Sequence, residues 1–222
     1  MFKEITPFTK KQLGIAGLLL LPFLVFLAWL LIAPDSLYAL DYAVNRALRG
    51  VPGSSLAGVV GAFTWLGNSY LLIVAAILIS FFGRFIKQTH RYSWLGVMTI
   101  LGPGVLNPLI KALVSRPRPD EALRLVSESG LSFPSGHSMG SVIFFGALAI
   151  LILKAWQPTP KAKRLFIAGT VVLVVLIALS RLYLSVHFFS DVCAGLSLGS
   201  TVLYLGTHFL PIFDRAILPS KK

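Results

Sequence analysis

Six long apolar segments, separated by shorter polar ones, dominate the sequence. Each is close to the ~20 residues with which an α-helix crosses the hydrocarbon core of a bilayer. Helices are the expected form, because backbone groups in lipid must find their hydrogen-bond partners within the segment. The pattern therefore predicts an all-α, polytopic membrane protein with six transmembrane helices in one bundle. The six segments are Leu13–Ala33, Leu56–Phe82, Tyr92–Val114, Ser138–Trp156, Leu165–Leu184 and Phe188–Pro211.

Four stretches modify this regular pattern. Gly67-Asn68-Ser69 interrupts the second segment, so the boundaries of that helix are the least defined. The third segment contains Gly102-Pro103-Gly104 and then Asn107-Pro108, which predict a kink near its end. Residues 34–55 mix charged with apolar positions, which predicts a short interfacial helix. In the last segment, Gly195 and Gly199 form a small-xxx-small pattern that predicts close helix packing, with dimerisation as the alternative.

The composition indicates one membrane domain. Only 13% of the 222 residues are charged, against about 25% in soluble domains. We therefore expect a single membrane-embedded domain over residues 1–222. The net charge of +12 does not indicate nucleic acid, because the basic residues flank apolar segments and form no stripe or known binding motif. Membrane lipids with anionic headgroups are the expected partners. The single cysteine, Cys193, excludes an intrachain disulfide.

Three clusters of polar residues stand among the apolar segments. Charged groups at membrane depth are costly, so these clusters require a functional explanation. If the chain has six spans, the side that holds both termini carries thirteen of the twenty Lys and Arg residues, and the other side carries seven. The positive-inside rule then predicts cytoplasmic termini and places all three clusters on the non-cytoplasmic face. The clusters are Lys111-x6-Arg118-Pro119, Phe133-Pro134-Ser135-Gly136-His137 and Ser180-Arg181-x5-His187-x3-Asp191.

The histidines of two clusters are candidates for chemistry. His187 and Asp191 are four residues apart at the start of a helix, so they share a face. The carboxylate can bind one imidazole N–H and leave the other nitrogen free as a nucleophile. A pair that only satisfies itself at a helix start explains this spacing equally well. His137 opens the fourth segment behind Ser135 and Gly136, where a helix N-terminus can bind an anion. Taken alone, an ordinary helix cap explains that cluster better.

The cations of these clusters are suited to phosphate. Lys111, Arg118 and Arg181 can surround a phosphoryl group with hydrogen-bond donors and positive charge. Phosphoryl transfer is catalysed mainly by positioning and charge stabilisation, so several cations fit that reaction. The alternative is that basic residues extend toward lipid headgroups, and we expect that role for Arg116 and Arg124.

Together, the three clusters resemble the three-part motif of the type-2 phosphatidic acid phosphatase superfamily, in its bacterial phosphatidylglycerophosphatase B or undecaprenyl-diphosphate phosphatase type. Arg116-Pro117 and Arg118-Pro119 stand in tandem, and only Arg118 has the family spacing from Lys111. The resemblance implies that His187 attacks phosphorus and becomes phosphohistidine, and that Asp191 orients it. It further implies that His137 protonates the leaving oxygen and then activates water. The residues that would bind the phosphoryl oxygens are Lys111, Arg118, Ser135, Gly136 and Arg181.

The resemblance implies a lipid phosphatase that needs no metal and no cofactor, and no second carboxylate stands beside Asp191 in the sequence. We expect it in a bacterial cytoplasmic membrane, with the active site facing the periplasm or exterior. Undecaprenyl diphosphate is the first expected substrate, and phosphatidylglycerophosphate and phosphatidic acid are further candidates. No obligatory protein partner is indicated. Two alternatives stay open: a phosphotransferase that passes the phosphoryl group to a sugar or lipid acceptor, and a lipid binder or transporter without catalysis.

Overall fold

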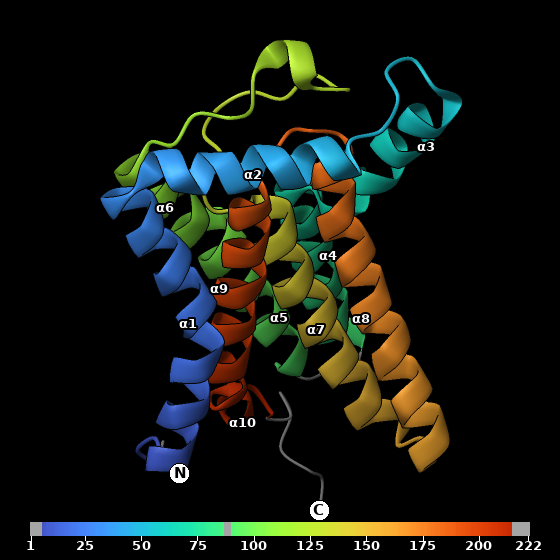
Figure 1. The fold of residues 1–222 in the computed structure, drawn as a ribbon. Helices are drawn as coiled ribbons and strands as arrows, with labels where there is room; N and C mark the ends of the chain where they lie inside the picture. Colours follow the sequence, from blue (N-terminus) through green and yellow to red (C-terminus); the bar gives the residue numbers. More distant parts are fainter. Residues whose placement is uncertain (1–5, 87–89, 215–222) are drawn as a thin grey trace, which may run out of the picture.

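The chain folds into a bundle of helices in a computed structural model, which describes residues 6–86 and 90–214. Figure 1 shows the long helices side by side, with one helix lying across their ends. No strand occurs within the described residues. The elements are α1 (Lys10–Ile32), α2 (Pro34–Leu48), α3 (Ser55–Thr64), the 3-10 turn η1 (Trp65–Gly67), α4 (Ser69–Ile86), α5 (Arg91–Thr99), the π-helix η2 (Ile100–Leu106), α6 (Asn107–Val114), the 3-10 turn η3 (Glu121–Leu123), α7 (Gly136–Trp156), α8 (Pro160–Tyr183), α9 (Phe189–Thr207) and α10 (Leu210–Phe213).

The predicted membrane architecture is confirmed. Among the described residues, five helical segments are long and apolar enough to cross a membrane, and a sixth is the pair Ser55–Gly67 and Ser69–Phe85, if these two are taken as one span bent by 45°. Large apolar side chains on their outer surface are exposed, as lipid-facing residues must be; Leu18 is 71% and Leu113 is 77% exposed. The five unbroken segments are Lys10–Ile32, Arg91–Val114, Gly136–Trp156, Pro160–Tyr183 and Phe189–Thr207.

The second segment breaks at the predicted interruption, and the third changes from α-helix to π-helix around the Gly-Pro-Gly stretch, whereas the kink predicted near its end stays a prediction. The second breaks at Asn68, whose side-chain oxygen accepts hydrogen bonds from the backbone N–H groups of Tyr70 at 3.0 Å and Leu71 at 3.2 Å. That cap starts α4 in a new direction. In the third, the chain passes Pro103 as the π-helix η2 and returns to α-helix at Asn107. A π-helical turn accommodates the N–H that proline lacks without ending the span.

The predicted short helix in residues 34–55 is α2. It lies across the end of the bundle in Figure 1, above α9 and α7. Its buried residues Leu37, Asp41 and Asn45 recur every four positions, so one face of α2 packs on the bundle. Asp41 and Asn45 are polar, and polar side chains are seldom buried without partners. The end of the bundle that α2 covers must therefore supply hydrogen-bond partners for them.

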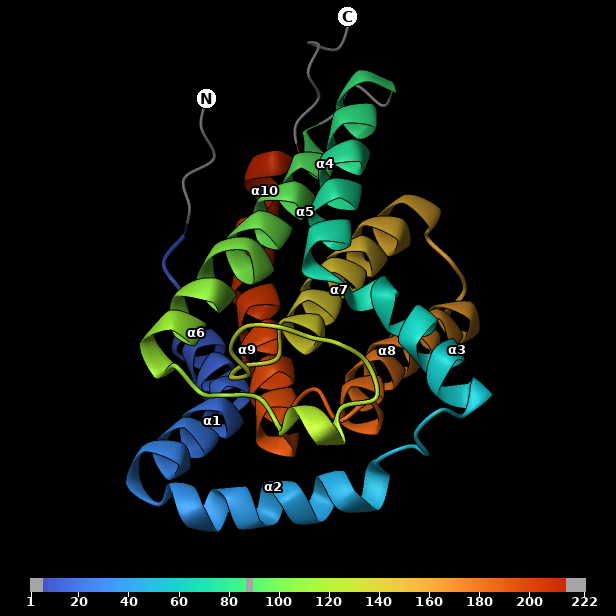
Figure 2. The same ribbon diagram turned by 90° about the horizontal axis from the view of Figure 1, so that it is seen from above.

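Helix α9 is the centre of the packing. It contacts α1 and α7 along most of its length, and Figure 2 shows it between them. Gly195 and Gly199 are where α7 comes closest, because an added Cβ would lie 2.5 Å from the carbonyl oxygen of Ser135 and 2.9 Å from that of Met139. The close packing predicted from the small-xxx-small pattern is therefore confirmed within the chain.

The first and last described residues lie at the end of the bundle opposite α2, where α1 begins and α10 lies (Figure 1). There His208 Nε2 is 2.8 Å from the carbonyl oxygen of Thr6. This agrees with a chain whose two ends share one side. The assignment of that side to the cytoplasm stays a prediction. Five of the basic residues on which it rests lie outside the described residues: Lys3, Lys87, Arg215, Lys221 and Lys222.

Candidate active site

The turn between α8 and α9 carries His187, and Asp191 follows one helical turn later. His187 Nδ1 lies 3.3 Å from Asp191 Oδ2, and the same oxygen accepts a hydrogen bond from the backbone N–H of Phe188 at 2.9 Å. The carboxylate thus holds the imidazole proton on Nδ1, which leaves Nε2 unprotonated. That nitrogen lies 3.1 Å from Arg118 Nη1, so the free lone pair faces the cations.

Burial and charge both keep His187 neutral. Its side chain is 1% exposed. This burial lowers the pKa of His187 well below its ordinary value, and the positive charges of Arg118, Lys111 and Arg181 lower it further. A neutral imidazole is the form that can attack phosphorus.

Arg116 binds the other side of the Asp191 carboxylate. Its Nη1 donates to Asp191 Oδ1 at 2.7 Å and its Nη2 donates to Asp41 Oδ2 at 2.6 Å. Only 2% of the residue is exposed, so our expectation that Arg116 extends toward lipid headgroups is wrong. The planar guanidinium can bind two carboxylates at once, which an isolated surface arginine would not do. Arg116 therefore fixes the carboxylate that orients His187.

Asp41 and Asn45, one turn apart on α2, bind the chain at the start of α9, on the side of His187 that faces α2. Asp41 Oδ1 accepts a hydrogen bond from the backbone N–H of Ser190 at 2.8 Å, and Asp41 Oδ2 accepts one from its hydroxyl at 2.7 Å. Asn45 Nδ2 donates to the carbonyl oxygen of His187 at 2.9 Å. Sequence reasoning did not assign Asp41 or Asn45 to the site. The available signal was their four-residue spacing, which puts both side chains on the same face as Leu37 of the predicted helix.

Asp41 is a second carboxylate near Asp191, which the sequence did not suggest. Arg116 lies between the two and pairs with both. Across the described part of the chain, no group of three or more His, Cys, Asp or Glu side chains is arranged to hold a metal ion. Asp41 and Asp191 instead bind the Arg116 guanidinium, and Asp191 also binds the His187 imidazole.

The second polar cluster packs at the start of α7. Gly136 is the first helical residue, and Ser135 is the N-cap, with its hydroxyl accepting a hydrogen bond from the backbone N–H of Ser138 at 3.3 Å. The carbonyl oxygen of Pro134 accepts one from Asn107 Nδ2 at 3.1 Å. An added Cβ on Gly136 would lie 3.1 Å from Asn107 Oδ1, so a larger residue would have to displace the Asn107 side chain. The helix N-terminus so formed is suited to an anion.

Lys111 and Arg118 both bind backbone carbonyls of the long loop between α6 and α7. Lys111 Nζ donates to the carbonyl oxygens of Leu131 and Ser132. Arg118 Nε donates to the carbonyl oxygen of Ser129 at 3.0 Å, and its Nη1 donates to the carbonyl oxygen of Val186 at 2.8 Å. Burial lowers the pKa of Arg118 to about 10, so it stays charged at pH 7. The loop and the cations therefore position each other.

Glu128 lies between the two arginines of the site. Its Oε2 is 2.5 Å from Arg181 Nη2, and its Oε1 is 3.6 Å from Arg118 Nη2. A carboxylate between two guanidinium groups takes the place that two oxygens of a phosphate would take. Sequence reasoning gave Glu128 no role, because one acid in a polar loop carries no distinguishing signal. Arg124 holds this loop, because it donates to the carbonyl oxygens of Pro119 at 2.7 Å and Glu128 at 3.0 Å; the headgroup role expected for it stays a prediction.

Two cavities meet beside His137. One, of about 350 Å³, is lined by Lys111, Arg118, Gly136, His137 and His187 together with parts of α4 and η2. The other, of about 520 Å³, is lined by His137 and Arg181 and lies against α3. Glu128 lines both.

Six of the eight candidate residues therefore meet around these cavities. Ser135 and Asp191 are fully buried and line neither cavity. Ser135 caps the helix behind Gly136, and Asp191 binds His187 from behind.

The site is thus built from three segments that are distant in sequence. Comparison with known proteins shows the family to which the chain belongs. The sequence model of the PAP2 superfamily matches residues 70–214. The chain belongs to the PAP2 superfamily. Members of this superfamily are metal-independent phosphatases that act on phosphate esters, and the chain is an integral membrane enzyme of that kind, a lipid phosphatase.

Three comparisons support the assignment to PAP2. The structure of a transmembrane PAP2-type phosphatidylglycerolphosphate phosphatase from Bacillus subtilis matches with a TM-score of 0.79 and 30% identity, over 90% of this chain and 98% of that one. Phosphatidylglycerophosphatase B of Bacillus subtilis is 34% identical over 195 residues, which are 85% of this chain and 94% of the relative. A decaprenylphosphoryl-5-phosphoribose phosphatase of Mycobacterium tuberculosis is 32% identical over 179 residues, 77% and 88% of the two chains.

Proposed function

We propose that this PAP2 enzyme hydrolyses the terminal phosphate of a lipid phosphomonoester or diphosphate through a phosphohistidine at His187. The observation that carries the proposal is the approach of His187 Nε2 to Arg118 Nη1, at 3.1 Å, beside a cavity that Lys111 and His137 also line. A tetrahedral phosphoryl group in that cavity would meet a nucleophile, a proton donor and cations together. Four other cavities among the described residues lack this combination of groups.

The reaction proceeds in two steps. His187 Nε2 attacks phosphorus, and the bond from phosphorus to the lipid oxygen breaks while His137 donates a proton to that oxygen. The lipid leaves as an alcohol or, from a diphosphate, as a monophosphate. Water then attacks the phosphohistidine, His137 takes up the water proton, and the P–N bond breaks to release inorganic phosphate. Asp191 stabilises the positive charge that develops on the His187 ring in the first step.

The remaining candidates bind the phosphoryl oxygens. Lys111, Arg118 and Arg181 supply charge, and the backbone N–H groups at the start of α7 add donors at Gly136. Ser135 contributes as the cap that holds this helix start. The side chain of Glu128 must leave the arginines when phosphate enters, because both anions require the same guanidinium groups.

The lipid tail is proposed to extend between the helices. The catalytic cavity is lined by Ile73 of α4 and by Pro103 and Gly104 of η2, which are apolar residues within the predicted spans. The whole chain, residues 1–222, serves as one phosphatase domain. It lies in a bacterial cytoplasmic membrane with the catalytic end facing the exterior. Support for this orientation is the excess of Lys and Arg assigned to the opposite side.

Phosphate release from the purified chain tests the proposal, with EDTA present and a panel of lipid phosphates. Undecaprenyl diphosphate, the first substrate expected from the family resemblance, and phosphatidylglycerophosphate, the lipid named for the Bacillus subtilis relative, are the first substrates to compare. We expect release with at least one of them. Turnover that appears only with an added sugar or lipid acceptor would instead identify a phosphotransferase, and binding without turnover would identify a lipid binder.

Variants test the mechanism separately. His187→Ala is expected to lower kcat at least about a thousandfold and to form no labelled enzyme from lipid with a radioactive terminal phosphate. His137→Ala is expected to slow release, so that labelled enzyme accumulates after an alkaline quench. His90→Ala, at the opposite end of the bundle, is the matched control and should keep wild-type turnover. Labelled enzyme in His187→Ala would refute the nucleophile assignment.

A further inference from the structure

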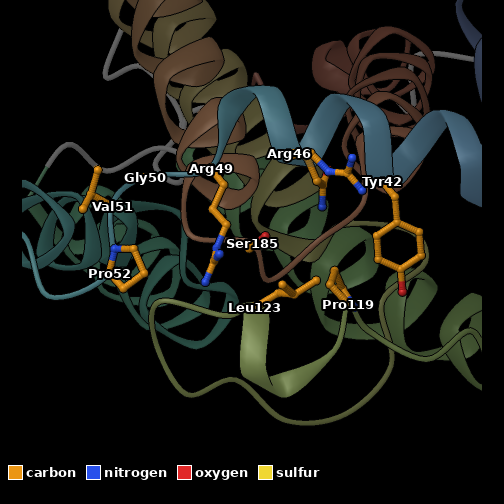
Figure 3. Close-up of a pocket in the computed structure, with 10 residues that line it drawn as sticks. Tyr42, Arg46, Arg49, Gly50, Val51, Pro52, Pro119, Leu123 and Ser185 are labelled. Atoms are coloured by element: carbon orange, nitrogen blue, oxygen red, sulfur yellow. The ribbon is translucent and has the colours of Figure 1, made fainter.

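A third cavity lies on the far side of the catalytic turn. It has a volume of about 380 Å³ and lies between the C-terminal end of α2 and the η3 loop, with Ser185 at its back (Figure 3). This volume is in the range of small-molecule sites, about 300–1,000 Å³. It shares no lining residue with the two cavities beside His137. It is therefore a separate space, and the proposed reaction does not use it.

Two guanidinium groups border this cavity. Figure 3 shows Arg49 reaching from the end of α2 toward Leu123, and Arg46 lying along α2 beside Tyr42. Of the described residues that line the cavity, none is acidic. Neither side chain has a hydrogen-bond or ion-pair partner within the described structure, and Arg49 Nε is buried without one. Two guanidinium groups that line one cavity and have no counterion can bind a phosphate group.

Asn45 offers the ligand a hydrogen-bond acceptor, whereas the two arginines offer donors. It lines the same cavity and is 4% exposed. Its Nδ2 is engaged with the carbonyl oxygen of His187, whereas its Oδ1 is buried and has no hydrogen-bond partner. An amide oxygen accepts only from a donor, so the matching group on a ligand is a hydroxyl rather than a phosphate oxygen. Charge and acceptor together fit a phosphate with a hydroxyl group nearby.

The surroundings of the cavity favour a lipid over a soluble ligand. Val51, which lines it, is 69% exposed, and Leu48 in the last turn of α2 is 43% exposed. Both are apolar and adjoin the arginines in sequence. The helix α2 lies across the ends of the membrane spans (Figure 1), which is the level of lipid headgroups. An acyl chain beside Val51 and Leu48 would bury surface that otherwise faces water.

We propose that this cavity binds the headgroup of an anionic phospholipid that carries a hydroxyl group beside its phosphodiester. Arg46 and Arg49 bind the phosphate, Asn45 Oδ1 accepts from the headgroup hydroxyl, and the chains lie along Val51 and Leu48. This site is distinct from the catalytic one and does not depend on the reaction proposed above. Free glycerol phosphate offers the same polar groups without the chains, so it serves as the soluble comparison.

Lipid binding to the purified full-length chain in detergent tests the proposal, with native mass spectrometry as the measurement. Phosphatidylglycerol is the probe, and orthovanadate is added as a phosphate analogue to occupy the catalytic cavity. We expect phosphatidylglycerol to stay bound in the presence of vanadate. Phosphatidylmethanol, with the same charge and no headgroup hydroxyl, should bind more weakly. Free glycerol phosphate should bind weakest of the three, because it lacks the apolar contacts.

The double variant Arg46→Gln/Arg49→Gln should raise the dissociation constant for phosphatidylglycerol about tenfold or more, because charge-assisted hydrogen bonds are lost. Lys161→Gln/Arg164→Gln, which removes the same charge at the opposite end, is the control and should bind as the wild type does. The melting temperature in the same detergent should be the same for all three proteins, which shows that the variants fold. Asn45 is left intact because it also holds His187.

Three results would overturn the proposal. Unchanged phosphatidylglycerol binding in Arg46→Gln/Arg49→Gln would remove the arginines from the site. Displacement by vanadate would place the lipid in the catalytic cavity. Equal affinity for phosphatidylmethanol, or for free glycerol phosphate, would exclude the headgroup hydroxyl or the lipid chains as determinants.

Discussion

At the scale of single residues, the partner of a charged side chain decides its role. Arg116 and Arg118 are two positions apart in a repeated Arg-Pro pair, yet they do different things. Arg118 faces the cavity beside His187 Nε2, whereas Arg116 is buried between Asp41 and Asp191. Removing one partner from such a buried group leaves uncompensated charge, so Arg116 is a positioning residue whose substitution acts through Asp191.

The substitution Arg116→Lys tests this role. Lysine keeps the charge but lacks the fork that reaches both carboxylates, so Asp191 and then His187 should lose their alignment. We expect kcat to fall about tenfold to a hundredfold, with KM nearly unchanged. The measurement is steady-state kinetics together with rapid-quench formation of the phosphoenzyme. Arg164→Lys, on an exposed position at the opposite end of the bundle, is the control. An increase in KM alone would show instead that Arg116 acts on substrate binding.

Glu128 should compete with substrate. It binds Arg181 and approaches Arg118 in the position expected for phosphate oxygens. The substitution Glu128→Gln removes the charge and keeps the shape, so we expect KM and the inhibition constant of orthovanadate to fall about threefold. The effect is modest because the side chain is 28% exposed, and partly exposed ion pairs contribute little. Glu121→Gln in η3 is the control. A higher KM would mean that Glu128 assists binding.

The buried imidazole of His187 should stay neutral in mildly acidic solution. Its pKa is lowered by burial first and by Arg118, Lys111 and Arg181 next. A lowered pKa means that protonation occurs only below the ordinary range near pH 6.5. We therefore expect NMR spectra of the substrate-free protein, labelled with 15N-histidine, to show a neutral His187 ring at pH 6. The signal is assigned by its loss in His187→Asn. A ring half-protonated at or above pH 6.5 would contradict this.

At the scale of helices, α2 and α9 build the site together. Helix α9 carries Asp191, and α2 holds Ser190 and His187 from the other side. Helix α7 can bring Gly136 and His137 to the same place only because α9 is narrow at Gly195, where the carbonyl oxygen of Ser135 approaches most closely. The backbone N–H of Ser135 also donates to the carbonyl oxygen of Asp191 at 3.0 Å. Packing of these two helices therefore sets the distance between His137 and His187.

The substitution Gly195→Ala tests that packing. An added Cβ would lie 2.5 Å from a backbone oxygen, so the start of α7 must move. We expect a lower melting temperature, because overpacking costs about 1–3 kcal/mol, and a kcat about tenfold lower. Gly169→Ala on α8 is the matched control, since its Cβ would meet nothing within 4 Å. Wild-type kcat in Gly195→Ala would show that the helix spacing does not control the site.

At the scale of the whole molecule, all three polar clusters meet at the end of the bundle that α2 covers, and the described chain ends lie at the other (Figure 1). The proposed orientation follows if the basic residues at the chain ends face the cytoplasm. A cysteine introduced by Glu121→Cys in a Cys193→Ala background should then react in intact cells with a maleimide that does not cross membranes. Lys163→Cys at the opposite end should react only after lysis. The reverse pattern would place the catalytic end in the cytoplasm.

Much of this architecture was readable from the order of residues. Apolar length sets the number of spans, because a bilayer has a fixed thickness and a helix a fixed rise. The spacing of His187 and Asp191 gives a shared face, and the three clusters predict a phosphate site. Helix ends were less certain: the first helix starts at Lys10 rather than Leu13, because Thr9 caps it.

Other features depend on contacts between segments that no local pattern records. Asp41 and Asp191 are separated by most of the chain, and Arg116 joins them only after α2 has folded across the bundle. The position of Glu128 between two arginines and the unpaired guanidinium groups of Arg46 and Arg49 arise in the same way. Periodicity and motifs show which residues are neighbours along the chain and which segments are too polar to lie in lipid. Which charge meets which is settled by packing, because burial makes each charge depend on the particular partner that surrounds it.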